Sequence, residues 1–393
     1  MSRFLQIIAK RFFRGQFVLL ACLGSAVLLS GCGSTPVEPP AALVEFKPEL
    51  TVKTVWSAQI GHGVDKEDLR LPPRLVGDTL YANDHKGIVV SLRADTGKQR
   101  WEIDLDESLT SGPGYGDGKV LIGTADGQVI ALAAEDGKIL WRAQVSSEIL
   151  APPAVGEGVV VAHTVDGKLF ALDAADGKQL WIYDRTVPTL TLRGTSSPVI
   201  LSDIVVDGFA SGKIALLVLR DGRVLWEKSI AVPRGRSELE RMVDIDASPL
   251  VIGSVLYVVS YQGRIAAIDL QSGRVLWSRA MSSSTGLAAD DRTLYVSDDN
   301  DRVWALDRAN GASLWQQEAL KRRSLTAPAV YKQSVVVGDM EGYLHWMARS
   351  DGHFMARFPV SSGVRVAPVV AGDRLYVYGN DGKLFCLEAS PRR

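Results

Sequence analysis

Side chains that could carry out chemistry are few in this sequence, and they are widely spaced. It has five histidines and three cysteines in 393 residues, and no two histidines have the spacing of metal ligands. Neither a G-x-S-x-G motif nor a glycine-rich phosphate loop occurs. Most aspartates fall in predicted turns, where a structural role is the default. We therefore predict no catalytic residue, no metal site and no cofactor, and so a protein that is not an enzyme.

One cysteine has a context that indicates a covalent modification. Cys32 follows Leu29-Ser30-Gly31, at the end of an uncharged apolar stretch that is preceded by basic residues. This arrangement is similar to a bacterial lipoprotein signal, and the similarity implies cleavage before Cys32 and lipid on that residue. Each buried methylene adds about 0.8 kcal/mol to membrane binding, so several acyl chains give a stable anchor. Gly33 in place of aspartate favours the outer membrane. An uncleaved signal anchor is the alternative.

The N-terminal residues therefore divide into two parts ahead of the folded domain. We expect residues 1–31 to be the lipoprotein signal peptide, and residues 32–50 to be the lipidated N-terminus and a flexible, proline-rich tether. Residues 51–390 remain for the folded domain. Within it Cys386 is the only cysteine, so we predict no intrachain disulfide and a small buried core residue at that position.

The overall charge restricts the class of partner. The chain carries a net charge of −1, with 46% hydrophobic and 23% charged residues, which is ordinary globular composition. Binding to nucleic acid needs a strongly basic surface to neutralise phosphates. The sequence therefore argues against nucleic acid as the main partner.

A strand–turn–strand pattern recurs through the folded domain. Its clearest copy is ALDAADGKQLW, residues 171–181, where an Asp-Gly turn separates two apolar runs. Counted from Gly167, alanine is at +4, leucine at +5, glycine at +10 and tryptophan at +14. The glycines at both turn positions suit a positive φ. Eight copies recur about every forty residues, and they start at Gly87, Gly127, Gly167, Gly212, Gly263, Asp301, Gly342 and Gly382.

Two further short apolar runs precede each copy, so each repeat has four strands. Repeats of this kind predict an all-β fold, an eight-bladed β-propeller of four-stranded blades. A solenoid is the alternative, but it would need distinct capping repeats. The eighth copy lacks its last strand, whereas residues 52–56 have the last-strand pattern with Trp56 and nothing before it. We predict that this N-terminal strand closes the ring and removes an exposed sheet edge.

The repeated strand pair resembles the tryptophan-docking motif of pyrroloquinoline-quinone dehydrogenases, which are also eight-bladed. This resemblance implies that the tryptophans pack between blades. It does not extend to the chemistry, because those longer enzymes carry an adjacent cysteine pair, a calcium site and a catalytic aspartate. A small periplasmic quinoprotein-like enzyme, or a quinone or sugar sensor, remains the alternative function.

With its lipoprotein signal, the whole mature chain resembles the BamB family, the propeller lipoproteins of the outer-membrane β-barrel assembly machinery. Cys32, the eight compact blades closed by Trp56 and two long connections between blades carry the resemblance. It implies a non-enzymatic scaffold, lipid-anchored in the outer membrane and facing the periplasm. It further implies binding to the POTRA domains of BamA, transient contact with unfolded outer-membrane proteins, and assistance in their delivery and insertion.

The two long connections run from Trp181 to Pro198 and from Trp226 to Pro249, and they should be neighbours on one face of the ring. Long loops on a rigid scaffold commonly carry function. We predict one partner-contact patch, and matching positions form part of the BamA-contacting surface in the family that the chain resembles. Alternatively, the leucines cover a loop core and the charges are merely solvated. The predicted contact residues are Leu190, Leu192, Arg193, Asp244 and Asp246.

The seventh copy departs from the pattern twice. It has Ala356 at +14, where tryptophan is expected, and Trp346 at +4, where the other copies have smaller side chains. We predict that Trp346 fills the space of the missing tryptophan. The alternative is that it lies on the opposite face of the sheet.

Overall fold

The computed structural model describes residues 38–392. The chain divides into two compact units, Met1–Pro40 and Ala41–Arg393. Of the first unit only residues 38–40 are described, and they have no regular secondary structure. The predicted signal peptide and Cys32 lie outside the described residues. Among the helices of residues 38–392, none is long and apolar enough to cross a membrane.

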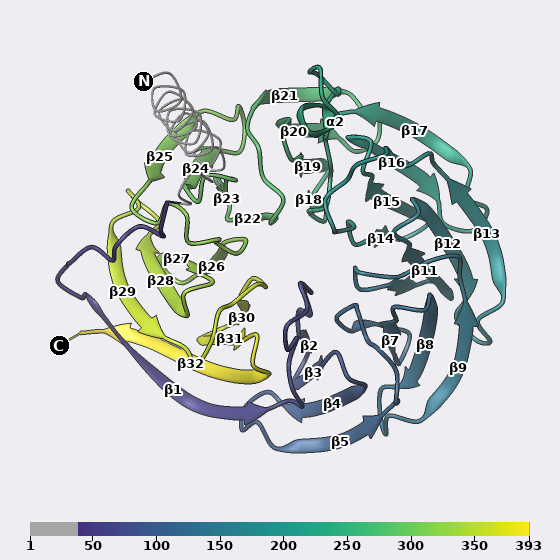
Figure 1. Cartoon of the computed structure of the whole chain (residues 1–393), viewed down its shortest axis with the longest axis horizontal. Coiled ribbons are helices and arrows are strands. Elements are labelled where there is room, and N and C mark those ends of the chain that lie inside the picture. The colour runs from purple at the N-terminus through teal and green to yellow at the C-terminus, as the bar shows by residue number, and fades with distance from the viewer. Residues whose placement is uncertain (1–37, 393) are drawn as a thin grey trace, which may run out of the picture. The chain divides into compact units, whose positions relative to one another are not determined.

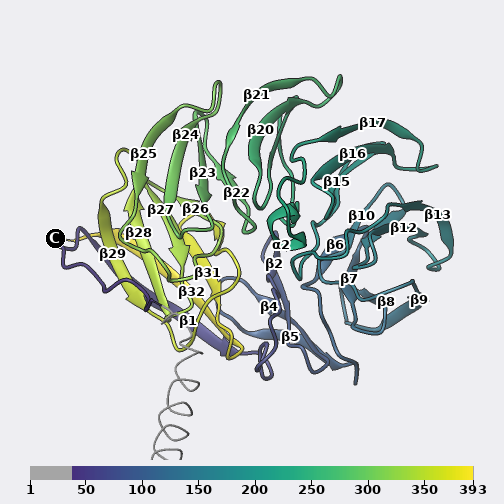
Figure 2. The same cartoon turned by 45° about the horizontal axis from the view of Figure 1, so that its top comes forward.

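The second unit is a ring of eight four-stranded antiparallel sheets around a central axis (Figure 1). The tilted view in Figure 2 shows the sheets as separate blades, in each of which the strands lie side by side from the centre to the rim. This confirms the predicted eight-bladed, all-β propeller. The innermost strand of most blades is the first in sequence, and the outermost is the fourth.

The strands are grouped by blade as follows. Blades one to four are β2(Arg74–Val76), β3(Thr79–Asn83), β4(Ile88–Arg93), β5(Gln99–Asp104); β6(Gly114–Gly116), β7(Lys119–Gly123), β8(Gln128–Ala133), β9(Ile139–Gln144); β10(Ala154–Gly156), β11(Val159–His163), β12(Lys168–Asp173), β13(Gln179–Asp184); and β14(Val199–Leu201), β15(Ile204–Gly208), β16(Lys213–Val218), β17(Val224–Ser229). Blades five to eight are β18(Leu250–Ile252), β19(Val255–Val259), β20(Arg264–Asp269), β21(Val275–Ala280); β22(Leu287–Ala289), β23(Thr293–Ser297), β24(Val303–Asp307), β25(Ser313–Gln317); β26(Ala329–Tyr331), β27(Ser334–Gly338), β28(Tyr343–Ala348), β29(Phe354–Pro359); and β30(Val369–Ala371), β31(Arg374–Tyr378), β32(Lys383–Pro391), β1(Leu50–Gln59).

The N-terminal strand closes the ring, as predicted. β1 pairs antiparallel with β32, from Leu50 opposite Pro391 to Gln59 opposite Lys383. The eighth blade therefore contains both ends of the folded domain, and its sheet order is β1-β32-β31-β30. This pairing supplies the outer strand that the last repeat lacks.

Each docking tryptophan joins its own blade to the next one. Trp101 donates its indole N–H to the carbonyl of Ala134 at 3.0 Å. A Cβ added at Gly137 would lie 2.7 Å from the Trp101 ring, so only glycine fits beneath it, and its φ of 75° also favours glycine. The motif thus has a packing role, in accord with the resemblance. The seven tryptophans that donate in this way are Trp56, Trp101, Trp141, Trp181, Trp226, Trp277 and Trp315.

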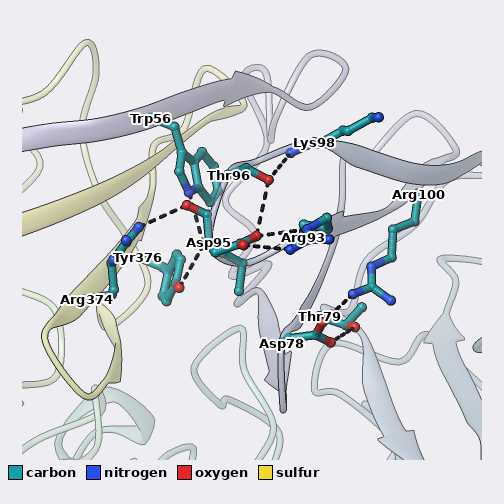
Figure 3. A network of polar contacts seen from close by, with 11 residues as sticks. Trp56, Asp78, Thr79, Arg93, Asp95, Thr96, Lys98, Arg100, Arg374 and Tyr376 are labelled. Atoms are coloured by element: carbon teal, nitrogen blue, oxygen red, sulfur yellow. Dashed lines mark hydrogen bonds and ion pairs between the residues drawn. The ribbon is translucent and has the colours of Figure 1, made fainter.

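The same contact secures the closing junction between blades eight and one (Figure 3). Trp56 Nε1 donates to the carbonyl of Ala94 at 3.0 Å, and the Tyr376 hydroxyl donates to the same oxygen at 2.9 Å. Arg374 Nη1 donates to the carbonyl of Asp95 at 3.0 Å. Side chains from both ends of the domain therefore converge on one turn of blade one.

The hydrophobic core lies between neighbouring blades. In one cluster, Tyr81 and Val89 of blade one pack with Val120 and Ile130 of blade two, and all four are buried. Cys386 is free, buried and part of another cluster, as predicted from its small size. Because each interface repeats round the ring, the blades form a rigid frame for the loops.

Two details differ from expectation. The end of the predicted tether, residues 41–49, lies along blade seven. There Ala41 N–H donates to the carbonyl of Lys321 at 2.9 Å, and Phe46 stacks on Phe354 with ring centroids 5.5 Å apart. In blade five, Gln262 rather than Gly263 takes the positive φ, at 45°.

Candidate partner-binding site on the loop face

Two neighbouring connections between blades form the candidate site. Residues 185–198 link β13 to β14, and residues 230–249 link β17 to β18. The Leu192 N–H donates to Asp244 Oδ2 at 3.0 Å, and the Ser197 N–H donates to Ser248 Oγ at 3.2 Å. The two long loops are therefore hydrogen-bonded to each other, in agreement with the prediction that they are neighbours.

The second loop contains a single turn of helix. α2(Glu238–Arg241) carries a capping box, in which Ser237 Oγ accepts the Glu240 N–H and Glu240 accepts the Ser237 N–H, both at 3.2 Å. All residues of this helix are exposed. A capping box stabilises the first turn by satisfying two backbone donors that the helix leaves free.

After this helix the chain turns inward. Residues 242–247 are all buried. The Tyr261 N–H donates to the Asp244 carbonyl at 2.7 Å, which ties the segment to blade five. The two predicted aspartates are thus held on a fixed strip of backbone beneath the first loop.

The five predicted contact residues come together, but they occupy two layers. Leu190 is 40% exposed, Leu192 is half-buried, and the exposed Arg193 pairs with Glu148 at 2.9 Å. Asp244 and Asp246 are only 1% and 8% exposed. The first three residues can therefore meet a partner directly, whereas the two aspartates support the loop from below.

The two aspartates form a buried carboxyl pair. Burial, reinforced by the Asp246 charge, raises the pKa of Asp244 to about 8. Burial also raises the pKa of Asp246. Carboxyl groups this close share a proton, because two adjacent buried charges are strongly unfavourable. The pair is therefore held with a proton near neutral pH.

Asp246 packs directly against the first loop. A Cβ placed on Gly194 would lie 2.8 Å from Asp246 Cγ, so a larger residue there would push the loop outward. The roles of Gly194 and Glu148 could not be predicted from the sequence. Both roles depend on a side chain from another blade, and spacing within one repeat does not reveal such contacts.

The described residues offer no obvious metal or catalytic centre. No group of three or more His, Cys, Asp or Glu side chains within residues 38–392 could hold a metal ion. Two histidines are buried in ion-pair geometry, His163 with Asp207 at 2.9 Å and His345 with Asp339 at 2.8 Å. What the site offers chemically is therefore a surface of two leucines and an arginine on a braced loop.

Comparison of the sequence with known proteins indicates one family. The family described as "Outer membrane protein assembly factor BamB" matches residues 49–108, 85–317 and 307–391. The chain is 52% identical over 372 residues to the protein of that name from Pseudomonas aeruginosa, covering 94% of this chain and 98% of that one. It is 36% identical over 385 residues to the Escherichia coli K12 protein of the same name, covering 94% and 98%.

Solved structures show the same likeness. The crystal structure of BamB from Moraxella catarrhalis superposes with a TM-score of 0.80 at 28% identity, covering 86% of this chain and 100% of that one. A europium-containing methanol dehydrogenase superposes with a TM-score of 0.72 at 13% identity, covering 86% and 93%. The second likeness is one of fold alone.

Proposed function

The chain belongs to the family of the outer membrane protein assembly factor BamB, and from this membership we propose that it is a non-enzymatic scaffold of the outer-membrane β-barrel assembly machinery. In this proposal its loop face binds the POTRA domains of BamA, and the complex assists delivery and insertion of outer-membrane proteins. Lipid on Cys32 anchors the protein in the outer membrane, and the propeller faces the periplasm. Unfolded outer-membrane proteins are transient partners.

The observation that carries the proposal is the bracing of one long loop by its neighbour. Leu192 N–H is fixed by Asp244, and this holds Leu190, Leu192 and Arg193 at the surface. Interface centres are enriched in apolar anchors and arginine, and a preorganised loop loses less entropy on binding. The loop therefore has the composition and the rigidity of a binding hot spot.

In this proposal the predicted site residues have two different roles. Leu190, Leu192 and Arg193 make the contact, whereas Asp244 and Asp246 position the loop that presents them. Removing Asp244 would leave the Leu192 N–H without its partner and free the loop to move. Substitutions at either layer should thus weaken the same interaction for different physical reasons.

The second candidate, a quinoprotein-like enzyme or sensor, is supported by fold alone, because the methanol dehydrogenase is only 13% identical. Titration with pyrroloquinoline quinone, followed by absorbance, separates the two functions. The scaffold predicts no saturable change in the cofactor spectrum, and a saturable change would favour the enzyme or sensor.

A pull-down from detergent extract tests the scaffold directly. The tagged full-length chain should bring down BamA, and the Leu192→Glu variant should bring down much less. Leu314→Glu is a matched control, because Leu314 is 54% exposed on β25, away from both long loops. Failure of the unmodified chain to retain BamA, under conditions where it stays folded, would contradict the proposal.

A further inference from the structure

A pocket of about 300 Å³ lies at the centre of the ring, on the face that carries the two long loops. Its walls come from connections that lead into the inner strands of blades one, three, four, five, six and eight, which surround the axis in Figure 1. The first long loop forms part of this wall. The polar side chains that matter for the argument are Arg70, Arg193, Thr195, Asp246 and Arg365.

Three guanidinium groups from three separate connections converge on this pocket. Arg70 Nη1 donates to the carbonyl of Ser284 at 2.8 Å, Arg193 pairs with Glu148 at 2.9 Å, and Arg365 pairs with Asp68 at the rim. Each guanidinium has five N–H donors, so each keeps free donors after these contacts. Two aspartates, Asp68 and Asp246, also line the pocket and offset part of this positive charge.

The pocket also holds polar atoms that nothing in the chain satisfies. Arg365 Nε, Thr195 Oγ1 and Asp246 Oδ1 are buried and have no hydrogen-bond partner within the described part of the chain. Asp246 itself is only 8% exposed. A buried polar atom left without a partner is unfavourable, so a ligand that pairs with it gains affinity.

The character of these atoms selects the ligand. The arginine N–H and the threonine hydroxyl can donate, and the lining carries three arginines against two aspartates, Asp68 and Asp246. Guanidinium groups bind carboxylates with two parallel hydrogen bonds, in a geometry that fits planar oxyanions. A pocket of this size with an excess of donors matches a carboxylate better than a cation or an apolar group.

We propose that this axial pocket is a carboxylate-binding site, in which Arg70, Arg365 and Thr195 hold the ligand beside the docking loop. The carboxylate has two possible sources, a small organic acid free in solution or an acidic side chain of the protein docked on the loop face. Only the second source depends on the function proposed above. In either case the ligand would contact Arg193 and Thr195 and so stiffen the loop that presents Leu192.

Calorimetric titration of the mature chain with citrate at low ionic strength tests the site. We expect saturable binding with one citrate per chain, weakened at least tenfold in Arg70→Gln and in Arg365→Gln. Thr195→Val should also weaken binding without lowering the melting temperature, because the hydroxyl it removes has no partner in the protein. Arg236→Gln, on the exposed part of the second long loop, is the matched control and should bind citrate as the unmodified chain does.

A second titration distinguishes the two sources. If the docked partner supplies the carboxylate, saturating citrate should weaken binding of a BamA POTRA fragment, and so should Arg70→Gln. If a free acid supplies it, saturating citrate should strengthen fragment binding by stiffening the loop, and Arg70→Gln should not weaken fragment binding in the absence of citrate. Leu192→Glu should abolish fragment binding and leave citrate binding intact, so the two proposals can fail separately. Absence of saturable citrate binding, or citrate binding equally strong in Arg70→Gln and Arg365→Gln, would overturn the carboxylate site.

Discussion

Trp346 on β28 and Ala356 on β29 lie directly opposite each other in the sheet of blade seven. In every other blade the tryptophan of the outer strand faces a smaller residue on the third strand, so blade seven has the same pair in reverse. Trp346 is completely buried. It packs in one cluster with Ala356 of its own blade and with Leu375 of blade eight. The reversed pair confirms that Trp346 occupies the space between blades. The other pairs are Ser91–Trp101, Ala131–Trp141, Ala171–Trp181, Leu216–Trp226, Ala267–Trp277, Ala305–Trp315 and Cys386–Trp56.

Truncation of Trp346 should strongly destabilise the propeller. Trp346→Ala removes a fully buried aromatic ring, so we expect a loss of roughly 3–5 kcal/mol in the free energy of unfolding. The double variant with Ala356→Trp should recover part of this loss, because the two sites share one space. Denaturant unfolding of the two single variants and the double variant measures the coupling, and strictly additive energies would contradict a shared space.

The buried carboxyl pair should make stability depend on pH. The pKa of Asp244 is raised to about 8 in the folded chain, above its ordinary value of 3.8, so the folded state favours the protonated form. Its contribution to stability is therefore fully present below the unfolded pKa and is lost as the pH rises toward about 8. Asp246 faces it directly, and the charges of Arg70, His163 and Asp299 act on Asp246.

Asp244→Asn should remove much of this pH dependence. Between about pH 5 and about pH 9, we expect the free energy of unfolding of the unmodified chain to fall by over 1 kcal/mol more than that of the variant. Urea unfolding at several pH values measures the difference. Asp203→Asn, in the exposed turn between β14 and β15, is a control for general charge effects. Parallel pH profiles for the unmodified chain and Asp244→Asn would refute the assignment.

Asp244 should support partner binding without touching the partner. Asn at this position keeps an oxygen that can accept the Leu192 N–H, whereas Ala does not. Asp244→Ala should therefore weaken binding to a POTRA fragment, and Asp244→Asn should retain most of it. Amide hydrogen exchange at Leu192 should speed up in the alanine variant only. Equal loss of binding in both variants would instead indicate direct contact by the carboxylate.

Cys32 should be the only attachment of the protein to the membrane. Cys32→Ser behind a cleavable signal should give soluble periplasmic protein, because lipid can no longer be added. Fractionation of cells that lack BamA checks this without interference from the partner. A serine variant that still sediments with washed membranes would show that another segment binds the bilayer.

The regular spacing of alanine, leucine, glycine and tryptophan in the repeats was sufficient to predict the blades and the closing strand. The residue beneath each docking tryptophan must be glycine, because its φ is positive and the indole ring leaves no room for a Cβ. These glycines therefore recur at a regular spacing that can be recognised in the sequence. Blade five is an exception. The spacing predicts the positive φ at Gly263, whereas the neighbouring Gln262 adopts it. The packing of Phe46 on Phe354 could not be predicted from the sequence either. A proline-rich composition does not show whether the segment lies against the folded domain.

Only part of the candidate site could be predicted from the sequence. Loop length pointed to the two connections that the structure shows hydrogen-bonded to each other. Burial of Asp244 and Asp246 could not be foreseen, because it depends on the first long loop lying over the second. The axial pocket was also invisible in the sequence, since Arg70 and Arg365 are nearly three hundred residues apart and meet only when the ring closes.

Calorimetric binding of a BamA POTRA fragment to the mature Leu192→Glu variant tests the central claim most directly. The account predicts binding weaker by at least about 2 kcal/mol, or roughly thirtyfold in Kd, with an unchanged melting temperature and with Leu314→Glu binding normally. A Kd for Leu192→Glu equal to that of the unmodified chain would contradict the claim that this loop face is the docking surface.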